Sequence, residues 1–532
     1  MRVSRRAALG GALTTALLPP GFHRAALAQP APAPRRGGTL QLTLVPEPPI
    51  LALGVNNQGP TQVAATKIFQ GLLRYTHSLE PLPELAKSWS VSEDGREYTF
   101  RLQENVKFHD GQPMTAEDVL FSIMQFHMQL SPRTRTIFGL IKEASAPDPL
   151  TVRLVLSQPF EPFLLMFSAT ACCIVPKHLF EGREFRQAPA VQAPIGTGPF
   201  RLAEWQRGNF IRLDRFDQYW RPGQPYLDSV IFRIIPDSQS RALALQNGQV
   251  QAALANDIEP FDLPRFRALP NMSVRTDGWE FSQPISWIEL NHRVKPLEDK
   301  RVRQAMSLAI DRNFIVNRLW FGVGKPCTGP LASSTRFYDP SIALPAHNIR
   351  AAQQLLDAAG YRAGANGVRF SLKHLVLPYG EVWTRLSEYL RQAMARIGID
   401  FQLETTDAGS WAQRIGQWEY ETSINWVSQF GDPTLGVERT YVSSNIQKVT
   451  FTNTGGYSNP QVDALFEKAR TSGDAAVRRE AFREVQRILV EEVPQVWIHE
   501  LAFPTIADKR VQNLVTLGMS AHASYDDVYF AG

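Results

Sequence analysis

Residues 97–126 read EYTFRLQENVKFHDGQPMTAEDVLFSIMQF, and this stretch shows the pattern that the rest of the chain repeats. From Glu97 to Leu102 polar and apolar side chains alternate, which is typical of a strand with one buried face. His109-Asp110-Gly111 then predicts a turn, because Asp and Gly favour the backbone conformations that reverse a chain.

A helix is predicted directly after this turn. Thr115 is suited to the N-cap position, and Asp118 stands three residues later, where its carboxylate can complete a capping box. The residues that follow place one apolar face at helical spacing: Val119, Ile123 and Phe126. A strand, a turn and a capped helix in one short stretch indicate mixed α/β structure.

The same two patterns recur along the chain. Alternation predicts further strands at 39–45, 152–156, 200–202, 211–213, 230–235, 369–377 and 400–405. Helical periodicity and end signals predict helices at 301–320, from Asn348 to Gly360, from Asn459-Pro460 onward, and at 475–492. Strands and helices that alternate in this way indicate an α/β chain with more than one sheet.

The composition is that of a globular protein of several domains. The chain has 532 residues, of which 44% are hydrophobic and 20% charged, so two to four domains of roughly 150 residues are expected. The net charge is +5, but the first 28 residues hold four basic residues and no acid; 52 basic and 51 acidic residues remain after them. A nucleic-acid partner is therefore not expected.

The N-terminus has the features of an export signal. A basic start is followed by an apolar run from Ala7 to Leu18, too short to span a bilayer, and by Ala26-Leu27-Ala28, a cleavage signal. Residues 1–28 are therefore predicted to be a signal peptide, and 29–37 a Pro/Ala-rich tether. Ser4-Arg5-Arg6 favours the twin-arginine class, and a general secretory signal is the alternative. We expect a periplasmic, soluble protein without a lipid anchor, because no Cys follows the apolar run.

The sequence offers no recognisable catalytic or metal-binding motif. It lacks G-x-S-x-G, HExxH and a phosphate-binding loop, and its ten His have no metal-ligand spacing. The three Cys are too few for a disulfide framework, and we interpret Cys172-Cys173 as buried core residues. A vicinal disulfide or a soft-metal site is the alternative for this pair. We therefore expect no enzyme activity, metal or cofactor.

Several segments, in order, resemble the family-5 extracellular solute-binding proteins of ABC importers, the dipeptide, oligopeptide and nickel group. The segments are Pro83–Trp89, Asp94–Phe100, Val106–Gly111, Met114–Val119, Ala146–Asp148, Ile195–Phe200, Tyr219-Trp220, Leu227-Asp228, Pro296–Arg312 and Tyr457–Leu465. Each segment alone is weakly specific, and their common order and spacing carry the resemblance.

The resemblance implies a two-lobed, hinged α/β fold of the periplasmic-binding-protein type (type II, cluster C-like). It implies a discontinuous lobe I (38–75, 190–280 and 505–532), an inserted domain (76–189) and a lobe II (281–504). It further implies a monomer that binds a peptide or peptide-like solute between its lobes and delivers it to a membrane permease and its ATPase. An exported enzyme and a non-transport sensor receptor on the same fold are the alternatives.

In this family one wall of the cleft comes from the region that here spans 411–432, and the resemblance makes ligand-binding candidates of Trp411, Trp418, Trp426, Gln429 and Asp432. Peptide-binding members resemble W-x-x-D at this point, where the Asp pairs with the peptide's α-ammonium. The register here is Trp426-Val-Ser-Gln429, so we expect Gln429 to face the cleft and to disfavour free-amino peptides, with Asp432 as a substitute acid if its loop bends inward. An opine-like or glutathione-like compound, an oligosaccharide or a metal chelate stays open as the ligand.

The Ile195–Phe200 segment contains Gly196 and Gly198. We interpret them as residues of a tight turn, with a hinge role as the alternative.

The double substitution of Arg5 and Arg6 by Lys tests the export signal. The twin-arginine pair is the part that its translocon reads, so we expect precursor to accumulate in the cytoplasm. Fractionation and immunoblotting measure this, and a normal periplasmic yield would place the signal in the general secretory class.

Overall fold

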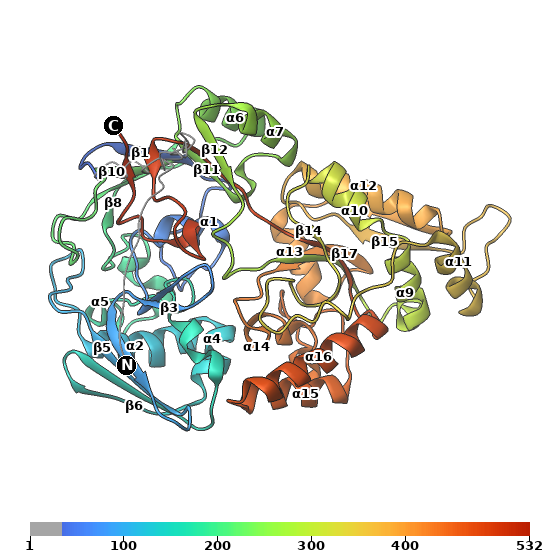
Figure 1. Ribbon diagram of the computed structural model, residues 1–532, viewed down its shortest axis with the longest axis horizontal. Coiled ribbons are helices and arrows are strands. Elements are labelled where there is room, and N and C mark those ends of the chain that lie inside the picture. Colours follow the sequence, from blue (N-terminus) through green and yellow to red (C-terminus); the bar gives the residue numbers. More distant parts are fainter. Residues whose placement is uncertain (1–33) are drawn as a thin grey trace, which may run out of the picture. The chain divides into compact units, whose positions relative to one another are not determined.

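A computed structural model describes residues 34–532, and the predicted signal peptide and most of the tether lie outside the described residues. The three largest sheets organise these residues (Figure 1). Each of the three is packed against its own cluster of buried side chains. We call the parts built on the seven-, six- and four-stranded sheets lobe I, lobe II and the inserted domain.

Lobe I is assembled from three separated parts of the chain. The order of its strands is β12-β19-β11-β1-β10-β9-β8. Their bounds are Met272–Arg275, Thr505–Asp508, Ala252–Leu254, Thr39–Thr43, Ser229–Arg233, Phe210–Arg215 and Phe200–Gln206. The central strand β1 pairs in parallel with β10 and β11, and its Leu40 and Leu42 are fully buried. The first strand of the described chain therefore depends on strands that are formed about 190 to 210 residues later.

Lobe II has the strand order β14-β18-β13-β17-β15-β16. The bounds are Lys325–Pro326, Val496–Glu500, Ile285–Leu290, Thr422–Val427, Phe370–Leu375 and Ile399–Glu404. Its helices include α9 (Lys300–Leu308), α11 (Ile349–Ala358), α12 (Glu381–Ala395), α13 (Ala408–Gln417), α14 (Pro433–Gly436), α15 (Pro460–Thr471) and α16 (Ala475–Glu492). Strands β15 and β17 are parallel, so their carboxyl ends lie at the same edge of the sheet.

The inserted domain lies between β3 (Pro81–Pro83) and β8 in the chain. Its antiparallel sheet has the order β4-β5-β7-β6, with bounds Ala86–Val91, Glu97–Leu102, Thr151–Leu156 and Ile141–Asp148. Helix α2 (Ala116–Phe121) contacts this sheet through β6 and β7, and the 3₁₀ helix η2 spans Glu161–Phe167. The predicted strand 97–102 and the capping box of Thr115 and Asp118 are both confirmed.

Two short segments connect lobe I to lobe II. One runs from β12 to β13 over residues 276–284, and the other from β18 to β19 over residues 501–504. The backbone N–H of Leu501 donates to the carbonyl of Pro284 at 2.9 Å, so the two segments are bonded to each other. We call them the crossover segments.

The helix predicted over 301–320 is wrong in its extent. Helix α9 ends at Leu308, and a new helical turn, α10 (Arg312–Phe314), starts after Asp311 and continues as a π-helical turn, Ile315–Leu319. The side chain of Asp311 accepts a hydrogen bond from the N–H of Phe314 at 3.0 Å, so this residue caps the second piece. By contrast, the predicted helix 475–492 matches α16 at both ends.

The two glycines at 196 and 198 allow close packing of the backbone at a bend of the chain over 197–199. Neither has a positive φ angle. A Cβ atom at Gly196 would lie 2.2 Å from the carbonyl oxygen of Ile68, and one at Gly198 would lie 2.4 Å from that of Lys67. The change of direction expected here is present as the bend over 197–199, and the two glycines also let two backbone segments of lobe I touch.

Replacing Gly196 with Ala tests this packing. The new methyl overlaps a backbone oxygen that cannot move alone, so we expect the free energy of unfolding to fall by about 1–3 kcal/mol. Urea denaturation measures the change. Gly59→Ala is the matched control, because a Cβ atom there meets nothing within 4 Å; equal stability of the two variants would contradict the interpretation.

Candidate functional site

Four aromatic rings meet where the crossover segments join the two lobes. The ring of Trp279, on the first crossover segment, lies 4.9 Å from that of Phe503 on the second and 5.5 Å from that of His522. Trp426, on β17 of lobe II, lies 5.5 Å from Phe503. All these contacts are edge-to-face, the geometry that aromatic quadrupoles favour. We call these four residues the hinge cluster.

Trp279 is half-buried and packs against the core clusters of both lobe I and lobe II. Its indole Nε1 is buried and has no hydrogen-bond partner among the described residues. A buried indole N–H usually finds an acceptor, because leaving it unpaired costs about 1–3 kcal/mol. The hinge cluster thus holds an unused donor beside apolar ring faces. This chemistry suits a small solute with a carbonyl or carboxylate oxygen, which reaches the enclosed donor when the lobes move apart.

His522 contributes an uncharged imidazole ring to the hinge cluster. Desolvation, with a smaller effect of the Lys67 ammonium, lowers the pKa of His522 to about 3. Lys67 itself is fully buried and donates to the carbonyl of Ala521 at 2.8 Å. At neutral pH the imidazole therefore carries no charge, and the cluster presents aromatic surface.

Of the five residues predicted to bind ligand, Trp426 is the one that belongs to the hinge cluster. It is half-buried on β17, opposite Ser286 of β13, and packs against the core of lobe II. Gln429 follows two residues after the strand, and the N–H of Gln429 donates to the carbonyl of Ser282 on the first crossover segment at 2.7 Å. The end of β17 is thereby held against the hinge. Ligand contact by Trp426 stays a prediction.

The side chain of Gln429 does not face a cleft, contrary to expectation. It is 3% exposed. Its Oε1 accepts from the N–H of Ala332 at 3.1 Å and from the hydroxyl of Thr335 at 3.2 Å, and its Nε2 donates to the carbonyl of Pro330 at 2.9 Å. The amide therefore holds the 330–335 loop of lobe II, a task for which a carboxylate lacks the donor.

Asp432 is likewise engaged within lobe II, which corrects its expected role as a substitute ligand acid. It is the N-cap of α14 and accepts from the N–H of Thr434 at 3.0 Å. Both of its oxygens also accept from Arg478 at 2.8 Å. Burial raises the pKa of Asp432, and the Arg478 guanidinium opposes that shift.

Trp411 and Trp418 lie away from the hinge cluster contacts. Trp411 is fully buried on α13, and its Nε1 donates to the hydroxyl of Ser423 at 3.0 Å. Trp418 ends α13 in a left-handed conformation, with the Arg293 guanidinium 3.7 Å from its ring centroid. Both tryptophans therefore have structural partners within lobe II.

The segment that leads from lobe I into the inserted domain reaches the same region, and Phe281 of the first crossover segment belongs to the buried cluster of the inserted domain. Tyr75, on β2 (Leu73–Tyr75), stacks on Phe281 of the first crossover segment at 5.3 Å, and Phe281 contacts Phe430 of lobe II at 6.3 Å. His77 pairs with Glu280 at 3.1 Å. These contacts place all three parts of the chain around the first crossover segment.

A cavity of about 220 Å³ lies elsewhere, on lobe II, and is lined by Lys373, Leu375, Glu404, Arg414, Glu419, Tyr420, Glu421 and Thr422. Glu404 in this cavity contacts Lys373 at 3.4 Å and Arg414 at 2.7 Å. None of the residues of the hinge cluster lines this cavity.

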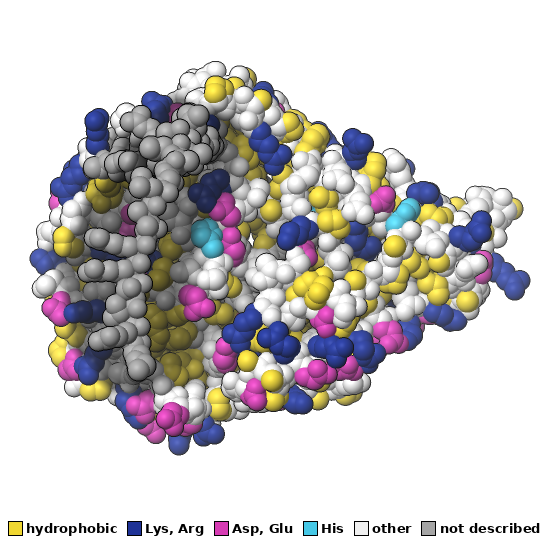
Figure 2. All heavy atoms as spheres, viewed as in Figure 1, with side chains coloured by type: hydrophobic (Ala, Val, Ile, Leu, Met, Phe, Trp, Pro, Cys, Tyr) yellow, Lys and Arg dark blue, Asp and Glu magenta, His cyan; other side chains and the backbone are white. Residues whose placement is uncertain are grey.

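No group of three or more His, Cys, Asp or Glu side chains in residues 34–532 is arranged to hold a metal ion. The three thiols are free and buried, which confirms Cys172 and Cys173 as core residues. Over the described part of the chain, no helix has the length and apolarity that a membrane span requires. On the face seen in Figure 2, basic and acidic side chains are interspersed.

Two lobes joined by paired crossover segments, with an aromatic site at the junction, define a two-lobed solute-binding protein of the periplasmic type. The sequence matches the family described as "Bacterial extracellular solute-binding proteins, family 5 Middle" over residues 80–448, and the chain belongs to this family. Proteins of this family bind a small ligand and deliver it to an ABC permease; they are transport-associated binding proteins.

Similar proteins cover nearly the whole chain. The glutathione-binding protein GsiB of Escherichia coli K12 is 28% identical over 470 residues, 86% of each chain. DppA from Helicobacter pylori, solved with the peptide STSA, has a TM-score of 0.81 at 25% identity and covers 94% of this chain and 99% of its own. AgaA from A. tumefaciens R10, solved with agropinic acid, has a TM-score of 0.80 at 26% identity and covers 93% and 99%.

Gln429→Glu tests the assignment of this amide to the 330–335 loop. The substitution keeps the shape but removes the donor to Pro330 and places a charge in a buried site, so we expect a loss of about 1–3 kcal/mol in the free energy of unfolding. Chemical denaturation at pH 7 measures it, with the exposed Gln192→Glu as the control. If both variants match the wild type, the amide does not hold the loop.

Proposed function

We propose that this chain is exported, matures at Gln29, and works in the periplasm as an unlipidated monomer that captures a peptide-like small solute at the hinge cluster. It then presents the solute to an ABC permease. The observation that carries this proposal is the unpartnered Nε1 of Trp279 at the point where both lobes and both crossover segments meet. A solute oxygen would satisfy this donor while the rings of Trp426 and Phe503 cover its apolar part.

The chemistry at the end of β17 narrows the solute class. Peptide-binding relatives resemble W-x-x-D, where this chain has Gln429, and that amide is committed to lobe II. Asp432 is committed to Arg478. With neither group free to pair with an ammonium, we propose that a free α-amino group contributes little to binding. Peptide-like compounds in the broad sense, including glutathione-like ones, fit this description, and the similarity to GsiB supports the class.

Calorimetric titration of the mature chain with glutathione, the tetrapeptide STSA and the N-acetylated form of each tests the solute class. We expect binding of at least one of these, with dissociation constants of its free and acetylated forms within about threefold. Truncating one partner of a buried charge pair between protein and ligand costs about 2–5 kcal/mol, so an amine-dependent difference above about 30-fold would contradict the proposal.

Trp279→Phe tests the site itself. The change keeps a ring for Phe503 and His522 and removes only the indole edge with its N–H. We expect the affinity for whichever of the four probes binds to fall by about 5- to 30-fold. The melting temperature of the ligand-free protein should not fall through loss of a hydrogen bond, because the donor has no partner in the protein. Trp89→Phe, in the inserted domain, is the control. Binding unchanged by Trp279→Phe, or lost equally in both variants, would remove Trp279 from the site.

A further inference from the structure

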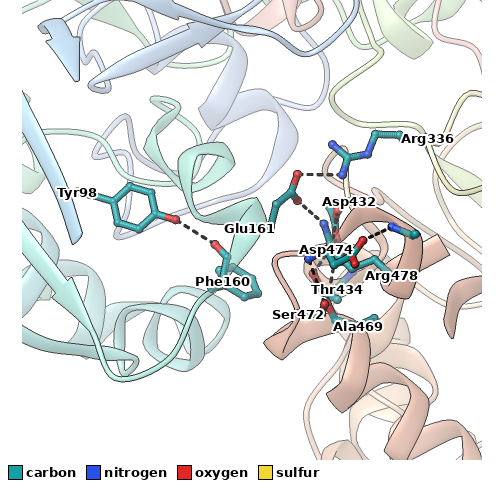
Figure 3. A network of polar contacts seen from close by, with 11 residues as sticks. Tyr98, Phe160, Glu161, Arg336, Asp432, Thr434, Ala469, Ser472, Asp474 and Arg478 are labelled. Carbon is teal, nitrogen blue, oxygen red and sulfur yellow. Dashed lines mark hydrogen bonds and ion pairs between the residues drawn. The ribbon is translucent and has the colours of Figure 1, made fainter. Parts of the chain in front are cut away.

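A charge network outside the hinge cluster connects the inserted domain to lobe II (Figure 3). Glu161, the first residue of η2 in the inserted domain, contacts two arginines of lobe II. One of its oxygens accepts from Arg478, and the other lies 2.9 Å from Arg336. Figure 3 shows Glu161 pointing from its own helix across to the lobe II side chains.

Arg478 is buried and has partners within lobe II in addition to Glu161. Its side chain is 0% exposed. Its Nε donates to the carbonyl of Ala469 at 3.0 Å, and its Nη2 donates to both oxygens of Asp432. The rings of Phe337 and Phe482 lie 4.9 and 5.6 Å from the guanidinium centre. Asp432 therefore neutralises the charge of Arg478. The contacts within lobe II also fix the guanidinium, so that its Nη1 donor is oriented toward Glu161.

Glu161 differs from Asp432 because it belongs to another domain and is partly solvated. Its side chain is 32% exposed, and that of Arg336 is 52% exposed. If the inserted domain moved away from lobe II, water could solvate Glu161 and Arg336, and Arg478 would keep Asp432. The bridge can therefore open without leaving a buried charge unpaired, which is the condition for a reversible contact.

Apolar packing accompanies the bridge. A Cβ atom at Gly431, next to Asp432, would lie 2.9 Å from Leu79 and 3.4 Å from Leu165, two residues outside lobe II. Leu435 of α14 is 4% exposed and belongs to the same buried cluster as Phe163 and Met166 of η2. The charge contact joins η2 to α16, and the apolar cluster joins η2 to α14, so both lie on the same side of lobe II.

We propose that Glu161 is a latch residue that stabilises the docked arrangement, in which η2 contacts α14 and α16, and so sets ligand affinity from outside the binding site. Glu161 is a positioning residue: it touches no ligand and acts by favouring the arrangement that keeps the lobes and the inserted domain around the hinge cluster.

Glu161→Gln is a clean test, because it keeps the shape and leaves the Arg478–Asp432 pair intact. Arg478 itself is unsuitable, since its removal would leave Asp432 buried and unpaired. Glu104→Gln is the matched control: it makes the same change in the inserted domain, at an exposed pair with Lys87. Equal melting temperatures of the three proteins establish that all are folded.

The readout is the distance between two spin labels, one on each side of the latch. All native thiols are buried, so labels can be directed to Lys142→Cys on the inserted domain and Lys468→Cys on α15, both exposed positions. Pulsed electron paramagnetic resonance then gives the populations of short and long distances in the dialysed protein and with glutathione added. We expect Glu161→Gln to lower the ratio of short to long populations by about 3- to 30-fold, and Glu104→Gln to leave it unchanged.

Distributions that coincide for the wild type and Glu161→Gln in both conditions would overturn the proposal, whether the common population is short or long. An equal shift in Glu104→Gln would also overturn it, since the effect would then be one of net charge. If glutathione changes no distribution but Glu161→Gln still shifts the dialysed protein, the latch stands and the proposed solute class is at fault. The experiment can therefore reject the proposed latch and the proposed solute class independently of each other.

Discussion

The hydrogen bond between the two crossover segments fixes the geometry on which the site depends. The N–H of Leu501 donates to the carbonyl of Pro284 at 2.9 Å, where the chain passes between the lobes in both directions. Because the segments are short and bonded to each other, the side chains they carry, Trp279 and Phe503, are held in contact. The end of β17 is tied to the same place, since the N–H of Gln429 donates to Ser282. A site built on a hinge can respond to movement of either lobe.

Local signals in the sequence predicted the elements that depend on local interactions. Strand β5 and helix α16 have the predicted bounds. Their alternation, helical periodicity and N-cap signals depend only on residues within or next to each segment. The break after α9 was missed because the apolar face continues through Ala309 and Ile310, while the cap at Asp311 that starts a new turn gave a weaker signal. At Gly196 the sequence shows a glycine, but the carbonyl of Ile68 that requires it lies 128 residues earlier in the chain.

The candidate site could be predicted only in part. Trp426 was identifiable because it ends an apolar strand, but Trp279, Phe503 and His522 are single aromatics in segments without periodicity. Their contact depends on the crossover geometry, which no local pattern encodes. Asp432 is held by its hydrogen bonds to Arg478, 46 residues away, and Gln429 is held by its hydrogen bonds to the 330–335 loop. Neither partner could be identified from the residues near Asp432 and Gln429 in the sequence. A polar residue next to a binding-site strand can serve the scaffold, and burial with satisfied hydrogen bonds distinguishes the two roles.

The central claim is that this chain is a receptor that holds one small solute where its lobes join. Native mass spectrometry of the protein purified from its own periplasm under mild conditions tests it most directly. The account predicts one bound solute of a few hundred daltons per chain, released on unfolding and rebound when the small-molecule fraction of the periplasm is returned. The result that would contradict this conclusion is the mass of the chain alone, both as purified and after the small-molecule fraction is added back, together with an unchanged melting temperature.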